Sequence, residues 1–489
     1  MRNQTIILIA TLILAIALSG AVSAAEGDTI IVSNAPGNTP SNGDSAHPSV
    51  SDDGVWVAYY SDASNLVAGD TNDGIRDIFL HNRITGVTTK LTSGSNGLSG
   101  SPSISGDGNW VAYISEAYTL VDGDNHDLYS DVFLYDRVRN VTSKVTPLSG
   151  SNGNSFYPSV SGDGNWVAYS SYATNLVAGD TPDSYSDIFL YDRVTGITTK
   201  VPPLSGSNGD RWAPSISADG NWVAYVSFAT NLVANDAEDG RSDIFLYDRV
   251  RDVTSKVTPL SGSNGHSGYN WAPSISADGV WVAYTSLASN LVASDTADTI
   301  WDIFLYNSVT GVTSKVTPLS GSNGHSYYVS VSGDGNWVAF SSEASNLVAN
   351  DAEDGHSDIF LYDRVRDVTS KVTPLSGSNG ISDGPSVSGD GNWVAFYSEA
   401  STLVAGDTNQ ASDVFMYNNP RVIDRSETPE RNNPSNSNTV NTNEFNQPNN
   451  TNLVNAATTV GMQTTGTPLG ALFLGLLTSM AALLIPRKK

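Results

Sequence analysis

A short phrase, Trp-Val-Ala followed by Tyr or Phe, occurs seven times in this chain of 489 residues. Its tryptophans are Trp56, Trp110, Trp166, Trp222, Trp281, Trp337 and Trp393. The intervals between them are 54, 56, 56, 59, 56 and 56 residues. A repeat of this length that carries short apolar runs is typical of an array of identical supersecondary units. The repeat therefore constrains the architecture and leaves the chemistry open.

Each repeat reads as four short β-strands. In the third copy, β-prone runs at 158–161 and 165–169 flank an Asp163-Gly164 pair, which favours a tight hairpin. A third run, 187–193, and a fourth, 197–201, are joined by another short turn. We expect a four-stranded antiparallel meander that lies between two like sheets, because its central runs are apolar on both faces. The prediction is an all-β, seven-bladed β-propeller over residues 26–418, with an open β-solenoid as the alternative.

The seventh copy lacks a clear fourth run after residues 413–417. A spare β-prone run, Thr-Ile-Ile-Val-Ser at 29–33, precedes the first copy. Pairing of these two segments would close the ring and cover an edge that otherwise invites aggregation. We therefore predict that the N-terminal strand completes the last blade.

The repeat resembles a known family. The Ser-x-Asp-Gly-x-Trp-Val-Ala-Tyr hairpin and the Asp-Ile-Phe-Leu-Tyr-Asp-Arg strand look like the TolB-like, WD-repeat-like propeller repeat over about residues 29–418. The resemblance implies the β-propeller fold. It implies little about function, because members of the family are binding platforms, periplasmic partners and peptidase domains.

The two ends of the chain read as targeting segments. Residues 1–25 combine Arg2, an apolar core at 6–18 and small residues before Glu26, which predicts a secretory signal peptide, with an uncleaved anchor as the alternative. Residues 419–467 are rich in Asn, Thr, Ser and Pro, and we expect a disordered stalk. Residues 468–489 hold an apolar run with a basic end, which predicts a C-terminal transmembrane helix.

The segment Met-Gln-Thr-Thr-Gly-Thr-Pro-Leu-Gly at 462–470 resembles the carboxy-terminal anchor of methanogen surface proteins. That resemblance implies an archaeal protein on the outer face of the cell membrane. It leaves open whether the helix is retained or is cut as a sorting signal. A buried core helix is the alternative for this run.

Composition narrows the classes of partner. The formal net charge is −26, from 50 acidic and 24 basic residues, so nucleic acid is excluded as a partner because phosphate binding needs the opposite balance. The chain has no cysteine, so a secreted fold must be held by packing alone.

An acidic loop follows the second strand of every repeat. Hard cations such as Ca²⁺ prefer closely spaced carboxylate oxygens, so these loops are candidate calcium sites. The alternative is that the carboxylates form Asx turns and cap loop amides. The candidate ligands are Asp70, Asp73, Asp77, Asp124, Asp127, Asp131, Asp180, Asp183, Asp187, Asp236, Asp239, Asp243, Asp295, Asp298, Asp302, Asp351, Asp354, Asp358, Asp407 and Asp413.

The connection between blades varies just before the inner strand, whereas the rest of the repeat is nearly copied. Aromatic residues at this position are expected near the mouth of the central channel, where they would stack on sugars or grip a peptide. The alternative is that they only plug the channel or pack between blades. The candidate binding residues are Tyr157, Trp212, Tyr269, Trp271, Tyr327 and Tyr328.

No catalytic constellation is evident. The six histidines are scattered, and neither a nucleophile elbow nor His-Glu-x-x-His is present. We therefore expect no enzyme, but a surface-displayed module that binds a wall polymer, a glycan or another surface protein. The alternatives are a self-associating surface-layer component and, third, a secreted hydrolase.

Overall fold

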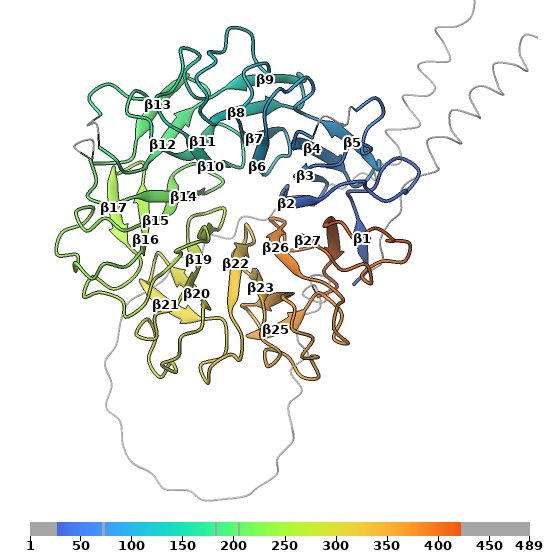
Figure 1. Cartoon of the computed structure of the whole chain (residues 1–489). Coiled ribbons are helices and arrows are strands. Elements are labelled where there is room, and N and C mark those ends of the chain that lie inside the picture. Colours follow the sequence, from blue (N-terminus) through green and yellow to red (C-terminus); the bar gives the residue numbers. More distant parts are fainter. Residues whose placement is uncertain (1–26, 71–73, 181–182, 204–205, 422–489) are drawn as a thin grey trace, which may run out of the picture. The chain divides into compact units, whose positions relative to one another are not determined.

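The computed structural model describes residues 27–70, 74–180, 183–203 and 206–421. Within these ranges, 28 strands form seven four-stranded antiparallel sheets around a central axis (Figure 1). This confirms the predicted all-β, seven-bladed propeller. No helix in the described ranges is long and apolar enough to cross a membrane. The predicted signal peptide, membrane anchor and all but residues 419–421 of the stalk lie outside the described residues.

The strands follow one another blade by blade. Blades 1 to 3 comprise β2 (Ser45–Val50), β3 (Trp56–Ser61), β4 (Asp77–Asn82) and β5 (Val87–Lys90); β6 (Ser99–Ile104), β7 (Trp110–Ser115), β8 (Asp131–Asp136) and β9 (Val141–Lys144); and β10 (Ser155–Val160), β11 (Trp166–Ser171), β12 (Asp187–Asp192) and β13 (Ile197–Lys200). Blades 4 and 5 comprise β14 (Arg211–Ile216), β15 (Trp222–Ser227), β16 (Asp243–Asp248) and β17 (Val253–Lys256); and β18 (Ser274–Ile275), β19 (Trp281–Ser286), β20 (Asp302–Asn307) and β21 (Val312–Lys315). Blade 6 comprises β22 (Ser326–Val331), β23 (Trp337–Ser342), β24 (Asp358–Asp363) and β25 (Val368–Lys371), and blade 7 comprises β26 (Ser382–Val387), β27 (Trp393–Ser398) and β28 (Asp413–Asn418) with β1 (Thr29–Ile31).

The N-terminal strand closes the ring, as predicted. β1 runs antiparallel to β28, with Thr29 opposite Tyr417 and Ile31 opposite Phe415. The ladder continues past the strand, where the Val32 N–H donates to the Val414 carbonyl at 2.8 Å. The first and last strands of the propeller therefore share one sheet. β1 covers the edge that β28 would otherwise expose.

The repeated tryptophan joins neighbouring blades. A Cβ on Gly108, in the hairpin turn of blade 2, would lie 2.6 Å from Trp56 Cδ1 of blade 1, and the Arg137 guanidinium lies 4.1 Å from the centre of the Trp56 ring. The same arrangement spans the closure, where Trp393 lies between Gly54 and Arg83. Only a glycine allows this approach, and its φ of +65° to +68° at Gly54 and Gly108 also favours glycine.

Hydrogen bonds between the inner strands also connect each blade to the preceding one. The Ile104 N–H of blade 2 donates to Ser49 Oγ of blade 1 at 3.0 Å. The equivalent bond across the seam runs from the Val50 N–H to Ser386 Oγ at 3.1 Å. Because the seam between blades 7 and 1 uses the same contact as the other junctions, the described residues form a closed ring rather than an open solenoid.

Candidate functional site

The inner strands carry β-bulges at one end of the central channel. In blades 1, 2, 3, 4, 6 and 7 the register shifts between the second and fifth residues of the inner strand. A residue in the left-handed region stands inside each shift, and in three blades it is a large ring: His47 (φ +52°), Tyr157 (φ +49°) and Tyr328 (φ +49°). A left-handed residue with a bulky side chain costs about 1–2 kcal/mol. Strain of this kind is characteristic of functional sites, where it aims a side chain.

The left-handed residues differ from blade to blade. Besides the three rings, the bulges hold Ser101, Ala213 and Gly384. Three large side chains thus alternate with small ones around a frame of nearly identical sheets. Variation at such a position of a nearly copied framework indicates a recognition surface.

Two tyrosines sandwich His47 at the seam of the ring. The centre of its ring lies 5.3 Å from that of Tyr60 on β3 and 5.7 Å from that of Tyr397 on β27, with interplanar angles of 25° and 19°. Tyr328 of blade 6 meets His47 edge-on at 6.5 Å. His47 is exposed as a whole residue. Desolvation by the surrounding protein and then the charge of Arg76 lower the pKa of its imidazole, so the ring is neutral at pH 7.

The same cluster continues into blade 5. Trp271 stacks on Tyr327 at 5.4 Å with an interplanar angle of 13°, and it meets Tyr328 edge-on at 6.2 Å. Trp301 packs against the other side of Trp271 at 5.1 Å. We call these seven residues the large aromatic cluster: His47, Tyr60, Trp271, Trp301, Tyr327, Tyr328 and Tyr397. Four consecutive blades, 5, 6, 7 and 1, contribute to it.

Carboxylates of blades 6 and 7 lie beside the tyrosines of this cluster. Burial raises the pKa of Asp383, on β26, to about 6, and the charges of Glu343 and Glu399 act in the same direction. Asp383 accepts a 2.8 Å hydrogen bond from Ser357 Oγ, and Glu343 accepts one of 3.3 Å from the Tyr327 hydroxyl. The cluster therefore presents aromatic faces together with negatively charged hydrogen-bond acceptors.

The remaining predicted rings form two smaller groups. Trp212 and Tyr269 both pack on Phe228, at 5.3 and 5.8 Å, and His266 completes this group. In the second group, Tyr157 lies 6.3 Å from Phe156, which meets Tyr172 edge-on at 5.9 Å. Tyr157 is 50% exposed and Tyr269 is 44% exposed, so both present faces to solvent.

The structure brings Trp271, Tyr327 and Tyr328 together as one surface. It adds four residues that sequence reasoning missed: His47, Tyr60, Trp301 and Tyr397. Tyr60 and Tyr397 directly follow the Trp-Val-Ala-Tyr/Phe phrase, where other copies have Ile114, Ser170, Val226, Thr285 and Ser341. That irregularity was a visible signal. His47 also carried a signal, because it stands in the first repeat at the position of Tyr157 and Tyr328. What the sequence does not mark is the pair of rings that encloses it.

In blades 1 to 6, the acidic loops form ion pairs with a lysine of the outer strand. In blade 1, Lys90 Nζ at the end of the outer strand lies 2.6 Å from both Asp70 Oδ1 and Asp77 Oδ2. The same Asp-Lys-Asp triad recurs in blades 2 to 6, where the lysine side chains are 0% exposed. These lysines are Lys144, Lys200, Lys256, Lys315 and Lys371. The first and last carboxylates of each of these loops thus bind an ammonium group.

The middle carboxylate shapes the loop itself. Asp127 accepts hydrogen bonds from the Tyr129 and Ser151 backbone N–H groups at 3.1 and 3.0 Å, and Asp354 accepts them from His356 and Ser378 at 3.0 and 2.8 Å. These are Asx-turn contacts, as in the alternative interpretation of the loops. Asp73 lies outside the described residues.

Among the described residues, no group of three or more His, Cys, Asp or Glu side chains is arranged to hold a metal ion. Calcium binding by these loops stays a prediction.

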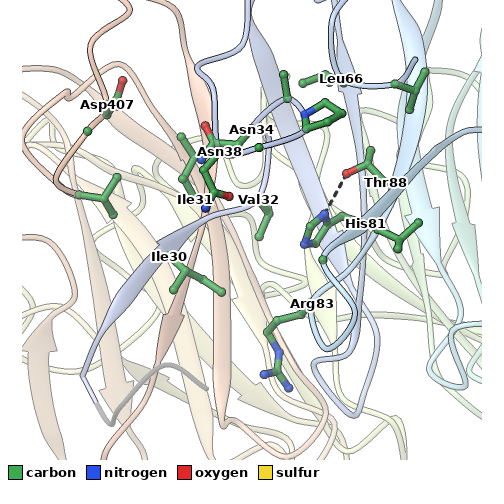
Figure 2. Close-up of a pocket in the computed structure, with 18 of the residues that line it drawn as sticks. Ile30, Ile31, Val32, Asn34, Asn38, Leu66, His81, Arg83, Thr88 and Asp407 are labelled. Atoms are coloured by element: carbon green, nitrogen blue, oxygen red, sulfur yellow. Dashed lines mark hydrogen bonds between the residues drawn. The ribbon is translucent and has the colours of Figure 1, made fainter. Parts of the chain in front are cut away.

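A cleft of about 750 Å³ lies where β1 meets blade 1 (Figure 2). Ile30, Ile31 and Asp407 line one part of it, and His81 and Arg83 line another. Burial and the Arg83 charge lower the pKa of His81 to about 4, so its imidazole is neutral at pH 7. The cleft lies at the seam of the ring, where the outer strand of blade 7 is only three residues long.

Solved β-propellers have a similar fold. An oligogalacturonate lyase in complex with manganese is 13% identical, with a TM-score of 0.50 over 82% of this chain and 100% of the lyase. An oligogalacturonate lyase from Vibrio parahaemolyticus is 14% identical, with a TM-score of 0.50 over 81% of this chain and 98% of that one. TolB from Acinetobacter baumannii is 16% identical, with a TM-score of 0.38 over 68% of this chain and 64% of TolB.

No family model matches this chain, and no curated protein matches it. At identities of 13 and 14%, the likeness to the two oligogalacturonate lyases shows the fold alone. The chain is therefore a seven-bladed β-propeller whose structural neighbours include TolB and oligogalacturonate lyases.

Proposed function

We propose that this protein is a binding module whose ligand is a glycan chain, held across the aromatic residues of the channel mouth, which are the large aromatic cluster and the two smaller groups around Tyr157 and Tyr269. The observation that carries the proposal is the contiguous ring surface built by blades 5, 6, 7 and 1 on otherwise copied sheets. The sequence features of residues 1–25 and 419–489 support display of this module at the cell surface.

The chemistry of these three aromatic groups suits a carbohydrate chain. Flat aromatic faces such as Tyr157 and Tyr269 pack against the apolar C–H faces of sugar rings. Carboxylates such as Asp383 and Glu343 accept hydrogen bonds from sugar hydroxyl groups, and accepted bonds to a charged group are stronger than neutral ones. A polymer is favoured over a single sugar, because the three aromatic groups are spread over several blades.

A basic peptide is the second candidate. The observation that favours it is a group of three carboxylates beside aromatic faces that attract cations. Burial and then the charges of Glu343 and Glu399 raise the pKa of Asp383, so the three carboxylates lie close together. A lysine- or arginine-rich segment of another surface protein would meet both features. Its affinity would fall with added salt far more than that of a neutral glycan.

The test is a binding screen with the purified full chain against a panel of immobilised neutral, acidic and amino glycans and a lysine-rich peptide. The variant Tyr157→Ala removes an exposed ring at the mouth, and Tyr185→Ala removes a 38%-exposed tyrosine from the outer loop of the same blade as a matched control. An aromatic contact contributes about 0.5–1.5 kcal/mol beyond area burial, so Tyr157→Ala should weaken glycan binding at least about two- to tenfold.

The proposal is supported if a glycan binds and only Tyr157→Ala weakens it. Binding of the peptide alone, with loss in high salt, supports the second candidate instead. Release of shorter products from the bound glycan would support the hydrolase alternative. A molecular mass that grows with protein concentration in the absence of ligand would support the self-associating surface-layer component. Protease treatment of intact cells, which should shed the propeller, tests the surface location separately.

A further inference from the structure

Among the residues that the structure describes, no lysine reaches the acidic site of blade 7. The outer strand there is β1, whose register places Ile31 opposite Phe415. In blade 3 the residue at that place is Lys200, opposite Phe189. An apolar side chain therefore stands where blades 1 to 6 supply an ammonium group.

The rest of the site is retained. Ser33 Oγ donates to Asp413 Oδ1 at 2.6 Å, just as Thr146 Oγ1 donates to Asp131 Oδ1 at 2.6 Å in blade 2. Ser41 Oγ donates a second bond to Asp413 Oδ1 at 3.0 Å, and a serine of blade 2 does the same for Asp131. One oxygen of the carboxylate is thus satisfied in the usual way, and only the partner of the other oxygen differs.

Three buried oxygen atoms in this site accept no hydrogen bond from the described residues: Asp407 Oδ1, Asn409 Oδ1 and Asp413 Oδ2. The first and third correspond to the two oxygens that bind the lysine ammonium in the other blades, such as Asp124 Oδ1 and Asp131 Oδ2. Asp413 is 0% exposed. A buried carboxylate oxygen without a partner carries a large desolvation cost, so the site calls for a cation.

Asn409 adds an amide oxygen to the site. Its Nδ2 donates to the carbonyl oxygen and to Oγ of Ser41, at 3.1 Å each, which leaves Oδ1 facing away from these partners. The Asp44 carboxylate lies close enough to interact electrostatically with Asp413, so a third negative charge stands near the site. Carboxylate and amide oxygens in a negative field are the ligands of hard divalent cations.

We propose that blade 7 binds one divalent hard cation of the Ca²⁺ class through Asp407 Oδ1, Asn409 Oδ1 and Asp413 Oδ2. The cation takes the place of the lysine ammonium, and water completes its coordination, since Ca²⁺ takes six to eight oxygen ligands. The site belongs to the blade that closes the ring, because Asp413 begins β28 and Ser33 follows β1. Cation binding therefore stabilises the closed propeller, and it is independent of ligand binding at the channel mouth.

The test compares the chelator-treated full chain with the variants Ile31→Lys and Ile31→Met, by calorimetric titration of CaCl₂ and by thermal melts. The unaltered chain should bind one Ca²⁺ per chain at this site, and its Tm should rise with Ca²⁺ concentration. Ile31→Lys supplies the ammonium that the other blades use, so it should abolish this binding and raise the Tm measured in chelator. In Ile31→Met the new side chain is similar in length to lysine but uncharged, so this variant should bind Ca²⁺ as the unaltered chain does. Asp407→Asn should lose the binding without adding a charge.

Three results would overturn the proposal. Calcium binding that is unchanged by Ile31→Lys would place the ion elsewhere, as in the acidic loops of the other blades. A Tm that responds to Na⁺ or K⁺ but not to Ca²⁺, with choline chloride as the reference salt, would replace the divalent ion by a monovalent one. No response to any cation would mean that the two carboxyl groups share a proton instead.

Discussion

The buried lysines should be among the most sensitive positions of the propeller, and Lys256 in blade 4 tests this. Its side chain is 0% exposed, and Nζ contacts Asp236 Oδ1 and, at 2.8 Å, Asp243 Oδ2. In Lys256→Met two buried carboxylates lose their counter-ion at pH 7. Removing one partner of a buried ion pair costs about 3–5 kcal/mol, so we expect a loss of that order in the free energy of unfolding.

The same blade offers a matched control. Arg251 pairs with Asp248 at 2.7 Å, but its side chain is 74% exposed. An exposed pair contributes at most about 1 kcal/mol, so Arg251→Met should change stability little. Urea unfolding followed by tryptophan fluorescence, with hydrogen exchange of β16 and β17, measures both variants. Equal losses in the two variants would refute the argument that burial makes the lysine important.

The loss in Lys256→Met should also depend on pH. Burial raises the pKa of Asp243 even with the lysine present, and removal of the ammonium raises it further. Between the unfolded pKa near 3.8 and the raised folded pKa, the folded state binds the proton more tightly, so stability rises as pH falls. The deficit of Lys256→Met relative to the unaltered chain should therefore narrow at pH 4.5. A deficit that is constant from pH 7.5 to 4.5 would contradict this.

Three further predictions follow from single sites. Gly220→Ala places a Cβ 2.3 Å from Trp166 Cδ1 at φ +68°, whereas the matched variant Gly196→Ala, at φ +70°, places its Cβ in open space. Each variant should lose roughly 1–2 kcal/mol of unfolding free energy for an alanine in the left-handed region. In urea unfolding, only Gly220→Ala should lose clearly more than that. Asp383→Asn removes a carboxyl whose pKa is raised to about 6, so it should raise the Tm at pH 7.5. It should also remove the gain in Tm that the unaltered chain shows as the pH falls from 6 toward 4. Equal pH profiles of the two proteins would contradict this. The raised pKa values of Lys90, Lys144, Lys256, Lys315 and Lys371 predict stability that is present below about pH 10.5 and lost as pH rises through the folded pKa, which alkaline melts would check.

The repeat made the fold predictable because every strand pairing except that of β1 with β28 joins strands that are consecutive in the sequence. The hairpin at Asp163-Gly164 and the pairing of residues 29–31 with β28 follow from alternation, turn residues and a missing run, all of which can be read in the sequence. The register is then fixed by packing, since a slip of one residue would expose the buried side chains.

The contents of the site were less predictable, because they depend on contacts between blades. His47 and Tyr397 are stacked although 350 residues separate them, and no periodicity says which rings meet across the seam. The role of the acidic loops had a signal that was overlooked: a lysine ends every outer strand of blades 1 to 6, always 20 residues after the first aspartate, as from Asp70 to Lys90. Only Ile31 breaks this pattern.

The central claim is that the channel mouth holds a glycan, and the most direct measurement is saturation-transfer NMR on a glycan from the binding screen. The account predicts transfer from the protein to the C–H faces of the sugar rings, with a weaker signal in Tyr157→Ala and an unchanged one in Tyr185→Ala. Transfer that is equal in all three proteins, or absent from every glycan of the panel, would contradict it.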